Sequence, residues 1–184
     1  MYKIYTKLAI LLFLALSSNV MAGPGMGKNP GTDTIYDIAS TNGNFTVLTS
    51  LLDATGLNAA LDGKGQFTVF APTDAAFTNL IAALVGAIGQ EATDDLLNDL
   101  DFLTNVLLYH VTDGRRFSNS VINKNNMKAI ETLFEGHYIW SKPSLMIMDE
   151  SSLTGDAGIV DGLFNINASN GVIHVIDAVL VPAE

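Results

Sequence analysis

The chain has 184 residues, of which 48% are hydrophobic and 15% charged, and its formal net charge is −10. This length suits one domain with a hydrophobic core, and the composition lies far from that of disordered chains. The acidic balance argues against nucleic acid and anionic membranes as partners, because like charges repel within a Debye length. The sequence has no cysteine, so disulfide bonds cannot contribute to stability.

The first 22 residues are typical of an export signal. Lys3 and Lys7 precede an apolar run over residues 8–16, and Val20-Met21-Ala22 has the small residues of a cleavage site. We expect cleavage after Ala22 and a secreted or periplasmic product. Because the leader holds two basic and no acidic residues, the mature chain would carry a charge of −12. No later segment approaches the roughly 20 apolar residues of a membrane-spanning helix, so no membrane insertion is expected.

Residues 23–31 are rich in glycine and proline and predict a flexible linker, followed by one domain over residues 32–184. The front half of this domain has apolar residues at helical spacing. Helices are expected over residues 32–39, 45–55, 58–61, 73–85 and, with the strongest pattern, 93–111.

One strand is expected within the helical half, over residues 67–71, where Phe67, Val69 and Ala71 alternate with Thr68 and Phe70. Pro72 stops this strand, because proline cannot donate to a sheet ladder. Thr73 or Asp74 can then cap the helix that follows by accepting hydrogen bonds from its free N–H groups.

The back half of the domain has the pattern of short strands. They are expected over residues 121–122, 127–133, 137–140, 145–148, 159–160 and 164–167. Asn170-Gly171 predicts a tight hairpin turn in which both residues have positive φ. The run from Val172 to Val181 is apolar on both faces, which predicts a final strand covered on both sides. Helices in front and strands behind indicate an α+β domain with a mainly antiparallel sheet.

Three motifs in this order resemble the fasciclin-like (fasciclin I type) domain. They are residues 67–77 (FTVFAPTDAAF), 108–111 (LYHV) and 169–182 (SNGVIHVIDAVLVP). The resemblance implies a wedge-shaped, mainly antiparallel β-sandwich with several helices from the N-terminal half packed on it. It also implies an adhesion module of extracellular or cell-envelope proteins, with no general catalytic site and no cofactor. The partners implied are other proteins or matrix and surface polymers, including polysaccharides.

Tyr109 and His110 correspond to the Tyr-His element that the resemblance implicates in partner contact. A second interpretation is open, because a histidine at a helix C-terminus is favoured by the helix dipole and can fasten the next loop. The sequence has no Arg-Gly-Asp, and its single Asp-Ile pair lies in the first expected helix.

His174 alternates with Val172 and Ile176, which places it on an apolar face of the final strand. A buried histidine needs a hydrogen-bond partner, and we expect Thr73 or Asp74 to supply it. Together with Asn170, Gly171 and Asp177, these residues are predicted to be structural, with Asp177 as a loop anchor.

No motif of nucleophilic, metal-dependent or phosphate-binding catalysis is present in the sequence. Asp149, Glu150, Asp156 and Asp161 could attract calcium, but their spacing matches no calcium loop and favours a solvated acidic face. We therefore expect no metal ligands. Asn44 and Asn167 each begin a glycosylation triplet, a short pattern with many chance matches.

Several large apolar residues lie in the irregular middle of the chain, among them Trp140, Phe117, Tyr138 and residues 146–148. They either join the core or form an exposed aromatic patch, and an exposed Trp140 would mark a partner surface. The sequence thus predicts a non-enzymatic adhesion or binding module that acts through its exterior. A structural component of an envelope or biofilm matrix is the first alternative, and an enzyme on the same scaffold is the second.

Overall fold

The structure is a computed structural model that describes residues 31–122, 125–151, 153 and 155–183. The predicted leader and the predicted linker up to residue 30 lie outside the described residues. No helix in the described part of the chain is long and apolar enough to cross a membrane.

The helices belong almost entirely to the front half of the domain, as predicted. They are α1 (Ile35–Thr41), α2 (Thr46–Thr55), α3 (Asn58–Leu61), α4 (Asp74–Ile88), α5 (Gln90–Leu97), α6 (Leu100–Tyr109) and α7 (Ser118–Val121). The strands are β1 (Phe67–Pro72), β2 (Val111–Asp113), β3 (Lys128–Glu131), β4 (Tyr138–Lys142), β5 (Met146–Met148), β6 (Ala157–Gly158), β7 (Ile166–Ala168) and β8 (Gly171–Ile176).

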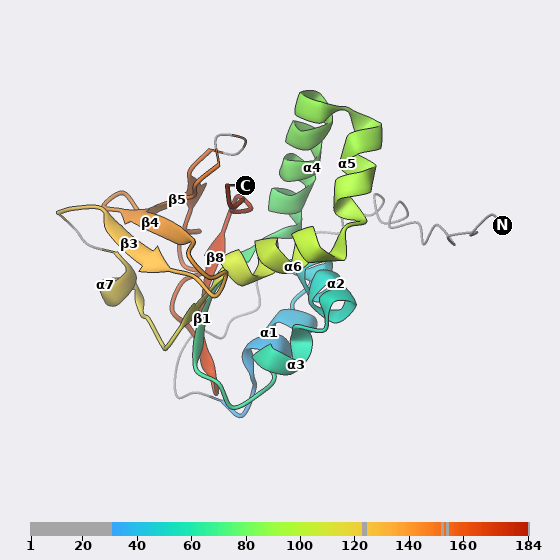
Figure 1. The fold of residues 1–184 in the computed structure, drawn as a ribbon. Helices are drawn as coiled ribbons and strands as arrows, with labels where there is room; N and C mark the ends of the chain where they lie inside the picture. The colour runs from blue at the N-terminus through green and yellow to red at the C-terminus, as the bar shows by residue number, and fades with distance from the viewer. Residues whose placement is uncertain (1–30, 123–124, 152, 154, 184) are drawn as a thin grey trace.

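The strands form two four-stranded sheets (Figure 1). Sheet A has the order β2-β1-β8-β7 and sheet B the order β3-β4-β5-β6. Strands β1 and β8 run parallel, and every other described pair is antiparallel. The domain is therefore α+β with two mainly antiparallel sheets, as predicted. Its two sequence boxes meet directly, because β1 and β8 are neighbouring strands with Phe70 beside His174.

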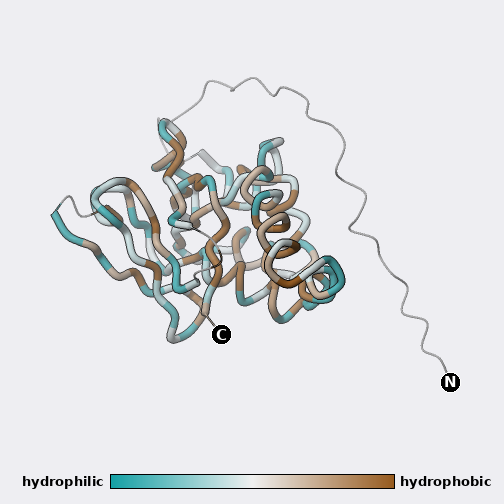
Figure 2. Tube along the Cα trace, turned by 90° about the horizontal axis from the view of Figure 1, so that it is seen from above, coloured by the Kyte–Doolittle hydropathy of each residue, from teal (hydrophilic) through white to brown (hydrophobic). Residues whose placement is uncertain are grey.

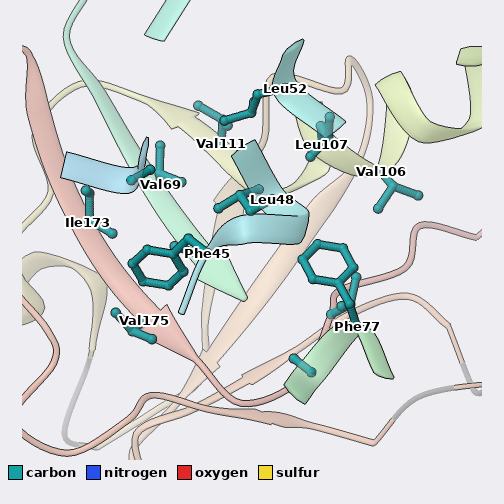
Figure 3. Packing of buried hydrophobic residues seen from close by; sticks show 14 of the residues in the cluster. Phe45, Leu48, Leu52, Val69, Phe77, Val106, Leu107, Val111, Ile173 and Val175 are labelled. Atoms are coloured by element: carbon teal, nitrogen blue, oxygen red, sulfur yellow. The ribbon is translucent and has the colours of Figure 1, made fainter. Parts of the chain in front are cut away.

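Sheet A lies between the helices and sheet B. On the helical side, Phe45 at the start of α2 and Leu48 within it lie near Val69 and Ile173, in a cluster that also includes Leu52 (Figure 3). On the other side, Phe70 of β1 and Ile176 of β8 join the inward residues of sheet B in a second cluster. Hydrophilic residues lie mainly at the outer loops and turns (Figure 2). All six residues of β8 are consequently buried, which confirms the prediction of a strand covered on both sides.

The strongest helical pattern, predicted as one helix over residues 93–111, is broken into α5 and α6. Asp99 causes the break, because its side chain accepts hydrogen bonds from the N–H groups of Asp101 and Phe102 at 2.9 and 3.2 Å. This cap starts a new helix in a new direction. Leu100, which the leucine spacing of this predicted helix would place with Leu96, Leu103 and Leu107 on its apolar face, is 53% exposed as a result. The strand predicted at residues 121–122 is also wrong, since Val121 ends the short helix α7.

The hairpin is present, but its turn is displaced by one residue from the prediction. Ala168 pairs with Gly171, so Ser169 and Asn170 occupy the turn. Neither Asn170 nor Gly171 has a positive φ. Glycine is needed at 171 for space, because a Cβ there would lie 2.2 Å from the backbone oxygen of Phe67.

Of the two residues that could cap α4, Thr73 does so, and Asp74 caps a different helix. Thr73 caps α4, since its hydroxyl accepts from the N–H of Ala76. Asp74 instead accepts from the N–H groups of Thr46 and Val47 at 3.2 and 2.9 Å, and so caps α2 from another part of the chain. Helix α2 has no side-chain cap of its own, so Asp74 satisfies its first N–H groups.

Candidate functional site

Tyr109 and His110 lie inside the domain, at 0% and 2% exposure. The Tyr109 hydroxyl donates to the carbonyl of Tyr138 at 2.7 Å and accepts from the N–H of Glu150 at 3.1 Å, which joins α6 to sheet B. Burial raises the pKa of this hydroxyl well above its ordinary value. Side chains without exposed surface cannot touch a partner. The partner-binding role predicted for Tyr109 and His110 is corrected accordingly, and the geometry supports their fold-fixing role.

His110 fastens the C-terminal segment to α6. Its Nδ1 lies 2.7 Å from the carbonyl of Val106, and its Nε2 accepts from the N–H of Leu180 at 2.9 Å. These partners fix the neutral tautomer with the proton on Nδ1. Burial lowers the pKa of His110 to about 4, and the bond to Val106 only partly opposes that shift.

Burial of His110 in its neutral form should make the domain less stable in acid. Above pH 6.5 the ring is neutral in both states, whereas between pH 6.5 and pH 4 only the unfolded chain binds the proton. The free energy of unfolding should therefore fall by about 3 kcal/mol as the pH falls through this window. Urea titrations across the window would measure it. His110→Gln should reduce the slope, and the part that remains includes His174, whose pKa burial also lowers. An unchanged slope in His110→Gln would contradict this assignment.

His174 is also buried, but its predicted partners are wrong. Its Nε2 lies 2.8 Å from the carbonyl of Arg116, and its Nδ1 accepts from the N–H of Asn165 at 3.4 Å. Its ring stacks on Phe70, and burial lowers its pKa. Thr73 and Asp74 lie beyond the end of the paired strands and cap helices instead.

Asp177 is a loop anchor, as predicted, because its carboxylate accepts from the N–H of Gly158 at 2.6 Å. It does not pair with Asp74, whose carboxylate is occupied at α2. Of the two glycosylation triplets, Asn44 is exposed, whereas Asn167 is half-buried and accepts a hydrogen bond from Arg115.

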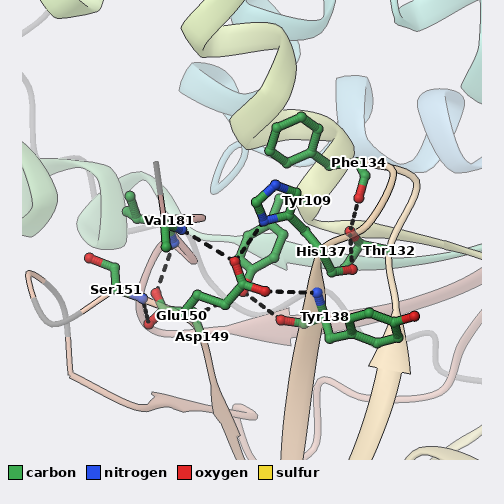
Figure 4. A network of polar contacts seen from close by, with 10 residues as sticks. Tyr109, Thr132, Phe134, His137, Tyr138, Asp149, Glu150, Ser151 and Val181 are labelled. Atoms are coloured by element: carbon green, nitrogen blue, oxygen red, sulfur yellow. Dashed lines mark hydrogen bonds and ion pairs between the residues drawn. The ribbon is translucent and has the colours of Figure 1, made fainter.

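Asp149 and Glu150 do not form the solvated face that the sequence favoured; they hold the C-terminal segment (Figure 4). Asp149 is buried and accepts from the N–H of Val181 at 2.8 Å. Glu150 accepts from His137 Nδ1 at 2.6 Å and from the N–H groups of Tyr138 and Ala183. Burial alone would raise the pKa of Glu150, but these hydrogen bonds outweigh it and lower the pKa.

Asp156 pairs with Lys142 at 2.5 Å, apart from these two residues. Among the described residues, no three His, Asp or Glu side chains are grouped so that they could hold a metal ion.

Trp140 lies on the face of sheet B that points away from sheet A, which we call the outer face. Its neighbours across the strands are Ala129 and Met148, and Tyr138 lies two residues along β4 on the same side. Inward residues of these strands are fully buried, whereas Trp140 is half-buried and Tyr138 is 38% exposed. The outer face therefore presents aromatic and methionine side chains to solvent, and Trp140 lies within it.

Two hollows in the described residues bear on the candidate site. The first is a cavity of about 20 Å³ within the helical core, large enough for a single water molecule at most. The second is an open cleft of about 700 Å³, which we call the C-terminal cleft. One wall comes from the helices: Leu84 and Ile88 of α4, Ala92, Asp95 and Leu96 of α5, and Phe102 of α6. The opposite wall includes Glu150, Val181 and Pro182.

Sequence reasoning missed the C-terminal cleft, although one signal was visible. Neither residues 65–114 nor residues 143–184 contain a lysine or arginine, and both walls come from these two stretches. Long gaps between basic residues predict an acidic surface, but only the fold places the two stretches opposite each other.

Taken together, the molecule is an α+β sandwich whose motif residues Tyr109, His110, His174, Asp74 and Asp177 all serve the fold. The family model described as Fasciclin domain matches residues 43–182, and the chain belongs to this family. The resemblance read from the three motifs is confirmed. The family is known from adhesion-related extracellular proteins.

The chain is similar to several known proteins. It is 32% identical to "Protein sll1483" of Synechocystis sp., over 81% of this chain and 73% of that protein. It is 30% identical to "Cell surface glycolipoprotein MPB83" of Mycobacterium bovis, over 87% of this chain and 66% of that protein. A solved FAS1 domain pair from the insect cell adhesion molecule fasciclin I matches with a TM-score of 0.60 at 16% identity. The match covers 83% of this chain and 51% of the pair, and it supports the fold alone.

Proposed function

We propose that the protein is an exported adhesion or binding module that contacts a cell-surface or matrix protein, or a surface polymer, through its exterior. The observation that carries this proposal is the contrast between the motif residues and the outer face. Each motif histidine and carboxylate already has an internal partner, so none is left to act on a substrate. The outer face, in contrast, offers half-exposed aromatic side chains of the kind that concentrate binding energy.

Family membership supports the proposal, since related proteins are of the adhesion type and one relative is described as a cell surface glycolipoprotein. The predicted leader supports export to the periplasm or beyond. The C-terminal cleft offers no histidine or hydroxyl nucleophile paired with a base, so the enzyme alternative gains no support from it.

The test is capture of partners by the mature domain on a glycan array and from surface proteins. Trp140→Ala should weaken the captured interaction about tenfold or more, because truncation of a central aromatic anchor removes most of its contact. Phe117→Ala is the matched control, since Phe117 is 38% exposed and lies on none of the strands of the outer face.

A saturable protein partner would support the adhesion role, and binding of polysaccharide alone would favour the matrix role. Binding that survives Trp140→Ala unchanged would remove the outer face from the proposal. Absence of any partner would overturn the proposed function.

A further inference from the structure

We propose that the C-terminal cleft binds a basic, apolar segment of another protein. The cleft is separate from the outer face, so this inference names a second surface and a partner chemistry. Its volume of about 700 Å³ falls within the usual range of ligand-binding clefts, and it is an open groove that can admit a chain segment.

The helical wall of the cleft is mainly apolar. Leu84 and Ile88 lie one turn apart on α4, and Ala92 and Leu96 lie one turn apart on α5, so each helix presents an apolar pair to the same groove. Ile88 is 48% exposed, although a side chain of this size normally adds to the core. The segment around Val181 and Pro182 closes the opposite side with further apolar surface. Amphipathic segments commonly bind with their apolar face in a groove of this kind.

The cleft is acidic, and this favours a positively charged occupant. The two stretches that form its walls, residues 65–114 and 143–184, hold seven and six of the chain's nineteen acidic residues. They hold no lysine or arginine, although Asp156 of the second stretch is paired with Lys142 just outside it. Asp95, Asp99 and Glu150 line the cleft itself. Asp99 caps α6 and Glu150 holds His137, whereas the Asp95 carboxylate has no hydrogen-bond or ion-pair partner among the described residues.

Charge also argues against the other occupants. A second copy of this acidic chain would bring like charges together, and an anionic membrane would do the same. A segment with lysine or arginine beside leucine-type side chains would match both the apolar helical wall and the acidic residues Asp95, Asp99 and Glu150. Electrostatic complementarity of this kind adds association rate and specificity to apolar contact.

The test is fluorescence anisotropy of the mature chain with a labelled amphipathic helical peptide of leucine and lysine. Two analogues of equal length serve as comparison peptides, one with glutamate in place of lysine and one with serine in place of leucine. Only the leucine–lysine peptide should bind saturably, with one peptide per chain. Binding should weaken as salt is added, because salt screens the charges of Asp95, Asp99 and Glu150.

Two variants locate the site, each with a matched control. Asp95→Lys should weaken binding about tenfold or more, whereas Asp161→Lys, an equal change in net charge at an exposed turn outside the cleft, should leave it within about twofold. Ile88→Ser should weaken binding to a similar degree, whereas Leu100→Ser, at a site of similar exposure outside the cleft, should not.

If Asp161→Lys weakened peptide binding as much as Asp95→Lys, the peptide would be attracted only by the net charge of the protein. That result would overturn the inference. Failure of the leucine–lysine peptide to bind, equal binding of the glutamate analogue, or concentration-dependent dimerisation through Ile88 would also overturn it. Loss of this inference leaves the proposed function standing, because capture through the outer face depends on Trp140, which does not line the cleft.

Discussion

Asn170→Ala should lower the free energy of unfolding by about 3 to 5 kcal/mol, because it leaves several buried backbone groups without partners. The Asn170 amide accepts from the N–H of Ile35 at 2.8 Å and donates to the carbonyls of Leu61 and Gly63 at 2.6 and 3.0 Å. It therefore joins the start of α1 and the end of α3 to the hairpin of sheet A. Urea unfolding would measure the loss, and hydrogen exchange should show faster opening of α1.

Ser169→Ala is the matched control, since Ser169 shares the turn but is only half-buried. It should change stability by less than about 0.5 kcal/mol. Asn170→Asp should be at least as harmful as Asn170→Ala, because it places a buried charge beside two carbonyl oxygens. If Asn170→Ala were as stable as the control, the hydrogen bonds to α1 and α3 would not contribute as assigned.

Gly171→Ala should cost about 4 kcal/mol or more. A Cβ at this position would lie 2.2 Å from the Phe67 carbonyl oxygen and 2.5 Å from Cδ1 of Ile35. The first of these is backbone in the neighbouring strand, so relief requires β1 and β8 to separate. Typical domains have only about 5 to 15 kcal/mol of stability, so the variant should be largely unfolded under mild conditions. Circular dichroism and thermal unfolding would measure this.

Gly86→Ala is the control for Gly171→Ala, and we expect it to raise stability instead of lowering it. Gly86 lies within α4, and an added Cβ there would have no heavy atom within 4 Å. Alanine has the higher helix propensity, so this change should stabilise the domain by up to about 1 kcal/mol. Tolerance of Gly171→Ala to the same degree would mean that β1 and β8 approach less closely than the structure shows.

Much of the fold could be predicted because burial follows simple periodic rules. The run from Val172 to Ile176 is apolar on both faces, and only a strand between two layers can bury both faces. The local sequence also limited the cap of α4 to Thr73 or Asp74, and the structure shows that Thr73 caps it. The break at Asp99 escaped prediction, because the leucine spacing continues through a cap that changes the helix direction.

The candidate sites depended on contacts between segments far apart in sequence. His174 was expected to bond to Thr73 or Asp74, but it meets the Arg116 carbonyl, a backbone group that carries no signal in the side-chain pattern. Trp140 could have joined the core or the surface, and only the side of sheet B on which it lies determined that it is half-exposed.

The sequence by itself determined the class of fold, the strand covered on both sides and the acidic character of the two stretches without lysine or arginine. These properties follow from the spacing of apolar residues and from the charges of the side chains. Both can be read from the sequence without knowing how distant segments are oriented. Tertiary structure alone decided the partners of Asn170 and His174, the burial of Tyr109 and His110, and the meeting of α4 and α5 with the C-terminal segment. Hydrogen bonds and clefts are directional arrangements of distant segments, so they exist only once the layers are in place.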